Sequence, residues 1–307
     1  MNFLELYHSL AKITIISIFL VICAGGFVRM TGSGMGCPDW PKCFGSWIPP
    51  THISQLPEDY KETYANRGYD ELDFNVFNTW TEYINRLLGL ISGLLCVGLL
   101  LISILTKHKV LIFYSCVLVL MMGFQAWMGA LVVYSILAPL KITIHMLIAL
   151  LILSLIMFLH RITSNIIVSS KGFGVKWVLL ALTISVIQIV MGTQVREEVD
   201  TLLYTFERSE IIMQLPIIFE VHRTFAWLVV IVNFVLLYNY QTLFKLYFEL
   251  KAIVVILCGL FVTGLLMSYH SMQGLYQCIH LIFSVLLFLC QFSILLKKSH
   301  FPSVDSP

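Results

Sequence analysis

Long apolar runs recur along the 307-residue chain and restrict its fold more than any other feature. Each run approaches or exceeds the ~20 apolar residues that an α-helix needs to cross a bilayer. A soluble domain would carry about twice the 12% of charged residues found here. The sequence therefore predicts an all-α membrane protein with eight transmembrane helices. They are expected at about 12–30, 82–105, 110–133, 139–159, 176–195, 216–238, 251–269 and 274–296.

The distribution of charge favours one orientation of these helices. Ten of the 19 Lys and Arg, including Lys171, would lie with three acids, including Asp305, in the termini and short connections of one side. Short connections rich in Lys and Arg tend to stay in the cytoplasm. We therefore expect both termini in the cytoplasm and the chemistry at the outer face. The first outer loop, 31–80, is rich in Gly and Pro and should be turn-rich, whereas 196–216 is compatible with a short helix on the membrane.

Polar residues repeat between the two halves of the chain. An Asn-Arg pair at Asn85 precedes His145 by 60 residues, and a His-Arg pair at His222 precedes His280 by 58 residues. An ionisable group within a membrane helix is costly unless it has a partner, so these histidines are functional candidates. One histidine alone could equally be an ordinary hydrogen-bonding residue between helices. Three at duplicated spacing favour a ligand site.

A glycine pattern repeats with the histidines. Gly129 and Gly264 each begin a Gly-x4-Tyr sequence, 16 residues before the far histidine of their half. The duplication predicts two pseudo-symmetric four-helix bundles, 1–165 with the outer loop 31–80, and 170–300, and such bundles commonly hold cofactors between facing helices. A transporter is the alternative for a duplicated membrane protein. Its polar residues would lie at mid-membrane, whereas these cluster at the outer helix ends.

The histidines suggest haem. A neutral imidazole is a good axial ligand for haem iron, and two imidazoles from facing helices make a six-coordinate site. His145, His222 and His280 are therefore candidate iron ligands in two haem sites, with Asn85 at the position of a fourth histidine. Zinc is disfavoured, because no carboxylate or thiol lies at ligand spacing within these spans.

Charged residues accompany the candidate ligands. Glu82 shares a helix face with Asn85 and Arg86, at positions i, i+3 and i+4. Its carboxylate could move protons or stabilise positive charge beside a cofactor, and an ion pair with Arg86 is expected in addition. Arg86 and Arg223 could neutralise haem propionates, or they could simply extend to the membrane interface.

Two of the eight cysteines, Cys37 and Cys43, lie in an outer loop. A compartment outside the cytoplasm permits disulfides, and the Pro-Asp-Trp-Pro-Lys sequence between the two residues favours a turn. The other six cysteines lie within spans and are interpreted as small apolar residues. The pair is either a structural disulfide or a redox-active pair, and the residues alone favour neither.

Together these motifs resemble the haem A synthase family, membrane enzymes that convert haem O to haem A for cytochrome oxidase assembly. The resemblance rests on the eight spans, the GGFVRMTGSGMGC sequence, the cysteine pair, Glu82-x2-Asn85-Arg86 and the three histidines. It covers nearly the whole chain. The combination is specific, although each motif alone is weak.

The resemblance implies an oxidoreductase that turns a methyl group of haem O into a formyl group, with oxygen from water. It places a haem b cofactor between His222 and His280. It places the haem O substrate or haem A product in the N-terminal half, with His145 as an iron ligand. Glu82 would be the catalytic carboxylate. Family members usually have histidine where this chain has Asn85, so the substrate iron would be five-coordinate or would take water or another residue.

The resemblance also implies partners. These are membrane lipid, haem O, a haem O synthase that delivers it, and an electron acceptor that the sequence does not identify. Nothing predicts nucleic-acid binding, and an oligomer is compatible with the sequence. Two other functions stay open. A dihaem cytochrome b-type quinol or electron-transfer protein would prefer four histidines across both leaflets. A non-enzymatic haem carrier would need neither Glu82 nor the cysteine pair.

Overall fold

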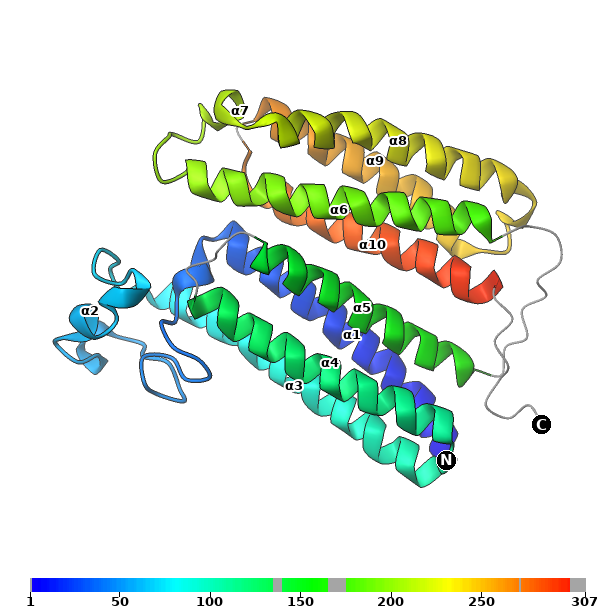
Figure 1. Cartoon of the computed structure of the whole chain (residues 1–307), viewed down its shortest axis with the longest axis horizontal. Coiled ribbons are helices and arrows are strands. Elements are labelled where there is room, and N and C mark those ends of the chain that lie inside the picture. The colour runs from blue at the N-terminus through cyan, green and yellow to red at the C-terminus, as the bar shows by residue number, and fades with distance from the viewer. Residues whose placement is uncertain (1, 135–139, 165–174, 271, 299–307) are drawn as a thin grey trace. The chain divides into compact units, whose positions relative to one another are not determined.

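The computed structural model describes residues 2–134, 140–164, 175–270 and 272–298. Eight helices in these ranges are long and apolar enough to cross a membrane (Figure 1). The described ranges contain no β-strand beyond an isolated bridge between Cys43 and Ser46. The predicted all-α class and the eight spans are therefore confirmed. Lys171 and Asp305, used to orient the chain, lie outside the described residues, and the orientation stays a prediction.

The elements follow one another in a simple order. The membrane helices are α1 (Phe3–Met30), α3 (Val76–Thr106), α4 (Lys109–Tyr134), α5 (Lys141–Ile162), α6 (Lys176–Leu202), α8 (Ile217–Asn239), α9 (Phe248–Tyr269) and α10 (Gly274–Lys298). The short connecting helices are η1 (Ser33–Met35), η2 (Ile53–Gln55), α2 (Tyr60–Thr63), η3 (Ala65–Arg67), α7 (Ile211–Gln214) and η4 (Gln241–Leu243). The first outer loop thus contains only short one-turn elements, as its Gly and Pro content predicts.

Two membrane helices begin before their predicted spans because polar residues cap them. The Asn2 side chain caps α1 in a capping box with Glu5. The Asn75 side chain caps α3 by accepting the backbone N–H of Asn78 at 3.1 Å. Side chains of this kind satisfy the free N–H groups of the first helical turn. Hydropathy locates an apolar stretch but not the polar turn that precedes it.

The segment after the fifth span differs from the expected short helix on the membrane. Its first residues continue α6 as far as Leu202, and α7 is a single turn. Val199 and Ile211 in this segment are buried in one apolar cluster with Phe219 and Met272. These two residues therefore pack within the protein, whereas Tyr204 and Met213 of the same segment are exposed.

The helices form two compact units, Met1–Ile156 and Met157–Pro307, which we describe separately. In unit 1, α1 packs on α3, and α3 packs on α4. Hydroxyl pairs link these helices, Tyr7 with Ser115 at 2.8 Å and Ser17 with Ser92 at 2.7 Å. Hydrogen bonds between small polar side chains commonly join membrane helices. The pseudo-symmetry and exact limits of the two predicted halves stay predictions.

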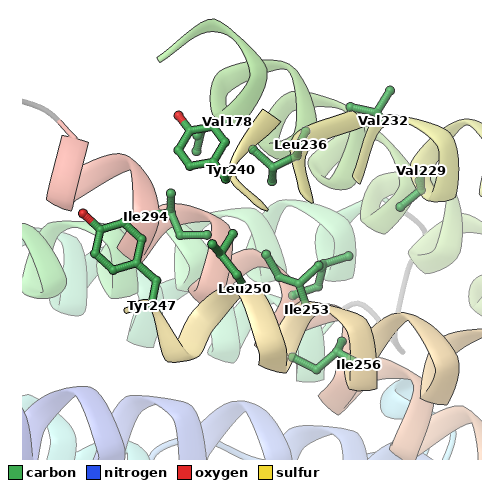
Figure 2. Packing of buried hydrophobic residues seen from close by; sticks show 12 residues of the cluster. Val178, Val229, Val232, Leu236, Tyr240, Tyr247, Leu250, Ile253, Ile256 and Ile294 are labelled. Atoms are coloured by element: carbon green, nitrogen blue, oxygen red, sulfur yellow. The ribbon is translucent and has the colours of Figure 1, made fainter. Parts of the chain in front are cut away.

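In unit 2, α6 packs on α8 and α10, and α9 packs on the same two helices. Their core is apolar, and Figure 2 shows Leu236, Leu250 and Ile294 directed into it from α8, α9 and α10. One polar cluster interrupts this core. Buried Gln291 donates to Asn233 Oδ1 at 2.9 Å and to Ser185 Oγ at 3.0 Å, and so joins α10 to α8 and α6.

Candidate functional site

Unit 2 brings His222 of α8 and His280 of α10 together. Their ring centroids are 6.5 Å apart, with the ring planes at 64°. A metal–imidazole bond is about 2 Å long, so two imidazoles on opposite sides of one ion have centroids roughly 6 Å apart. The observed separation fits one haem iron held between the two rings.

Each of these two rings lies against a glycine of a neighbouring helix. A Cβ atom on Gly192 of α6 would lie 3.2 Å from His222 Cε1. A Cβ atom on Gly264 of α9 would lie 3.8 Å from His280 Cε1. The contact at Gly192 is the tighter of the two, so a side chain at this position would press on the His222 ring. The absence of side chains at these positions leaves room for the imidazoles.

His145 of α5 has a similar environment in unit 1. A Cβ atom on Gly129 of α4 would lie 3.6 Å from His145 Cε1, so the repeated Gly-x4-Tyr glycines mark the surfaces on which histidine rings lie. The tyrosines of the two patterns differ. The Tyr134 hydroxyl donates to the Trp40 carbonyl of the first outer loop at 2.8 Å although the residue is 42% exposed, and Tyr269 is 81% exposed.

Two glutamines that the sequence analysis missed hold the histidine backbones. Gln125 of α4 donates to the carbonyl of His145 at 3.0 Å. Gln188 of α6 donates to the carbonyl of His222, also at 3.0 Å. Each glutamine lies four residues before the glycine that faces the ring. This Gln-x3-Gly signal is present in the sequence, but it precedes the histidine by 20 residues in one case and 34 in the other, so a search at fixed spacing misses it.

Several polar side-chain atoms of two of these histidines, of the two glutamines and of Asn85 are buried without a hydrogen-bond partner among the described residues. They are Nδ1 of His145 and His222, Oε1 of Gln125 and Gln188, and Oδ1 of Asn85. Buried polar atoms normally have a partner, in the protein or in ordered water. Unpartnered atoms at three predicted ligand positions, Asn85, His145 and His222, fit sites that accommodate a further group.

Glu82 lies elsewhere in unit 1, at the junction of α3 and the first outer loop. Its Oε2 accepts the backbone N–H groups of Gly36 at 2.8 Å and Cys37 at 3.0 Å. Its Oε1 binds the Arg86 guanidinium through Nε, at 3.1 Å, and through Nη2. The two side chains are only 6% and 13% exposed. The ion pair considered in the sequence analysis is therefore present and buried.

Arg86 uses all five of its N–H donors within the protein. Besides the two bonds to Glu82, Nη1 donates to the carbonyls of Asp39 at 2.6 Å and Lys42 at 3.0 Å. Nη2 donates to the carbonyl of Cys37 at 3.3 Å. Neutralisation of a haem propionate by Arg86 stays a prediction, and it requires some of these bonds to exchange.

Cys37 and Cys43 form a disulfide, and both residues are fully buried. Arg86 contacts this disulfide loop, residues 37–43, from the side of α3. Arg67 donates to the Pro38 carbonyl of the same loop and lies over the ring of Tyr134, 4.6 Å from its centroid. The loop is therefore fixed to helices α3 and α4 as well as by its own covalent bond.

Aromatic rings pack beside the disulfide. Phe44 meets four rings edge to face, at centroid distances from 5.6 to 6.1 Å: Tyr60, Tyr64, Tyr69 and Phe74. Such edge-to-face pairs add to the stabilisation that burial provides. Burial raises the pKa of the Tyr69 phenol well above its ordinary value. The phenol therefore stays protonated and donates to the Met35 carbonyl.

The corresponding charges of unit 2 have a different environment. Glu220 and Arg223 of α8 form an ion pair at 2.5 Å, but their side chains are 49% and 57% exposed. The guanidinium of Arg223 lies over the Phe219 ring, 5.5 Å from its centroid. Arg223 is thus accessible to an anionic group, whereas Arg86 is enclosed.

One family model and several known proteins match the sequence of this chain. The family model described as "Cytochrome oxidase assembly protein" (COX15-CtaA) matches residues 8–292. A protein of Pelagibacter ubique named "Heme A synthase" is 27% identical over 96% of this chain and 97% of its own length. Proteins of the same name from Shewanella oneidensis and Ehrlichia canis are 30% and 29% identical, over 49% and 59% of this chain. In these two matches the chain spans about half of the relative, 44% and 56%. Because the family model covers nearly the whole chain, this protein belongs to the COX15-CtaA family of cytochrome oxidase assembly proteins.

Proposed function

We propose that this integral membrane protein is a haem A synthase, which oxidises a methyl group of haem O to a formyl group. The observation that carries the proposal is the facing pair His222 and His280, 6.5 Å apart, in a chain of the cytochrome oxidase assembly family. The Pelagibacter relative, aligned over 96% of this chain, is named for the same activity.

In this proposal unit 2 holds haem b. His222 and His280 would hold its iron, and Arg223, the residue after His222, has an exposed side chain that would neutralise a propionate. When bound, haem b supplies a redox centre that accepts and releases one electron at a time. Gly192 and Gly264 leave room for the two imidazoles.

Unit 1 receives the substrate. His145 ligates the iron of haem O, and Asn85 takes the place of the second histidine usual in the family. An amide oxygen is a weaker ligand for iron than imidazole. The substrate iron is therefore five-coordinate or takes water on the Asn85 side. Both sites lie toward the outer face, with both termini in the cytoplasm.

The reaction needs both water and an electron acceptor. A methyl group and one water become a formyl group, with release of four protons and four electrons. A quinone or a redox protein takes the electrons, and a haem O synthase supplies the substrate. Glu82 stabilises positive charge that develops beside the macrocycle or accepts a proton. To accept a proton, Glu82 must exchange one of its present hydrogen bonds.

The decisive experiment uses a host that makes haem O. The protein is purified, its haems are extracted, and they are separated by chromatography with mass detection. Haem A together with haem b supports the synthase, whereas haem O and haem b without haem A overturn it and favour a carrier. His222→Ala should remove the low-spin haem b signal, and His145→Ala should change mainly the substrate haem. Identical spectra in the two variants would refute the assignment of two sites.

A further inference from the structure

A hydrogen bond from α9 reaches one of the two facing histidines. Thr263 Oγ1 and His280 Nδ1 are 2.8 Å apart, and Thr263 is buried. The hydroxyl has a single hydrogen, and Oγ1 also lies within hydrogen-bonding distance of two carbonyls of its own helix, those of Gly259 at 2.7 Å and Leu260 at 3.1 Å. When this hydrogen bonds one of the two carbonyls, which can only accept, Oγ1 acts as an acceptor toward the imidazole. The hydrogen of this bond is accordingly assigned to His280 Nδ1, and the Leu260 carbonyl is a second acceptor beside this imidazole.

This arrangement determines which nitrogen of His280 can bind a metal. A neutral imidazole with its hydrogen on Nδ1 has its lone pair on Nε2. Metal-binding histidines usually donate their other N–H to an oxygen, which orients the ring and strengthens its donation to the metal. His280 has such an acceptor in Thr263. In contrast, Nδ1 of His222 has no hydrogen-bond partner among the described residues, and the Gln188 amide nitrogen lies 3.0 Å from the His222 carbonyl and 3.4 Å from its other ring nitrogen, Nε2.

We propose that Thr263 is a positioning residue of the haem b site. Its hydroxyl oxygen holds His280 in the Nδ1–H tautomer, with Nε2 available to the iron, and strengthens this ligand relative to His222. The inference rests on the proposed function, since it requires haem b between the two histidines. A stronger axial donor stabilises ferric over ferrous iron, so the hydrogen bond lowers the reduction potential of the bound haem.

The test compares Thr263→Val with Thr263→Ser in the full-length protein purified with its haem. Valine has the same shape without the hydroxyl, and serine keeps the hydroxyl. The midpoint potential of haem b is measured by spectroelectrochemical titration, and haem loss is measured by transfer to excess apomyoglobin. Thr263→Val should shift the potential upward and weaken haem binding by about 10-fold or more, as when other such partners of metal ligands are lost. Thr263→Ser should stay close to the wild type.

The chain offers a matched control in unit 1. Thr14 of α1 is also buried, and its hydroxyl bonds the Leu10 carbonyl of its own helix at 2.8 Å. Thr14→Val removes a comparable hydroxyl and should leave the potential unchanged. Thr263→Ala provides the same comparison if Thr263→Val does not retain haem.

The outcomes separate this inference from the proposed function. An unchanged potential in haem-loaded Thr263→Val overturns the role of Thr263 and leaves the haem site intact. Equal shifts in Thr263→Val and Thr263→Ser also overturn it, because they indicate packing rather than the hydrogen bond. If the wild-type protein shows no low-spin haem b that depends on His222, the proposed function itself is wrong.

Discussion

Replacing Arg86 with methionine should release the first outer loop from α3. The variant loses the buried ion pair with Glu82 and the bonds to the carbonyls of Cys37, Asp39 and Lys42. Methionine keeps an apolar stem of similar length, so the change is mainly one of charge and hydrogen bonding. The Glu82 carboxylate keeps its two backbone N–H donors but loses its cation.

The expected effect is large because the pair is buried. Removal of one partner from a buried ion pair costs about 3–5 kcal/mol, since the other charge is left uncompensated. Cys37 and Cys43 are fully buried, so a reductant reaches their disulfide only when the loop opens. Each 1.4 kcal/mol changes the equilibrium constant for opening of the loop by a factor of about ten. Reduction of the disulfide should therefore accelerate by roughly two to three and a half orders of magnitude, up to the rate of an unprotected disulfide.

The assay follows the reduction rate in detergent, by alkylation and mass spectrometry of the Cys37 and Cys43 peptides. The six free cysteines are blocked beforehand. Arg223→Met is the matched control, because its pair with Glu220 is exposed and worth less than about 1 kcal/mol. A rate in Arg86→Met within about threefold of the wild type, or an equal acceleration in Arg223→Met, would refute the reasoning.

Three further substitutions test the two sites. Asn85→His should create or strengthen a second six-coordinate low-spin haem, and an unchanged absorption spectrum would mean that position 85 does not face the iron. Glu82→Gln should retain haem while haem A formation falls strongly, and conversion at the wild-type rate would remove Glu82 from the mechanism. Gly192→Ala should weaken haem b binding, because its Cβ would press on His222 at 3.2 Å. Gly93→Ala, where a Cβ meets nothing within 4 Å, should leave haem content unchanged, and equal haem loss in both would exclude the steric explanation.

The fold was predictable from the sequence because hydropathy depends on local composition. The buried pair of Glu82 with Arg86 was also predictable, since helix geometry places residues i and i+4 on one face. The bonds from Arg86 to Asp39 and Lys42 were not, because they join residues 47 and 44 positions apart through the conformation of a turn-rich loop.

The same limit applies to the candidate site. Repeated spacing identified the three histidines as candidates, because duplication preserves distances along the chain. It did not identify Gln125 or Gln188, whose hydrogen bonds depend on which helices become neighbours. Gln125 joins the third membrane helix of its unit, α4, to the fourth, α5, whereas Gln188 joins the first membrane helix of unit 2, α6, to the second, α8. Contacts between helices follow from packing, which spacing along the chain does not determine.

The hydrogen bonds around Glu82 form a cyclic network between α3 and the first outer loop. One carboxylate oxygen binds the backbone at Gly36 and Cys37, the other binds Arg86, and the remaining donors of Arg86 return to the same loop. Once any member is lost, the others hold a loop that is already partly released, so a second loss costs less than it would alone. Substitutions at Gly36, Glu82, Arg86 and the disulfide should thus be epistatic. During evolution these positions would be constrained as a group, while the exposed pair of unit 2 could diverge one residue at a time.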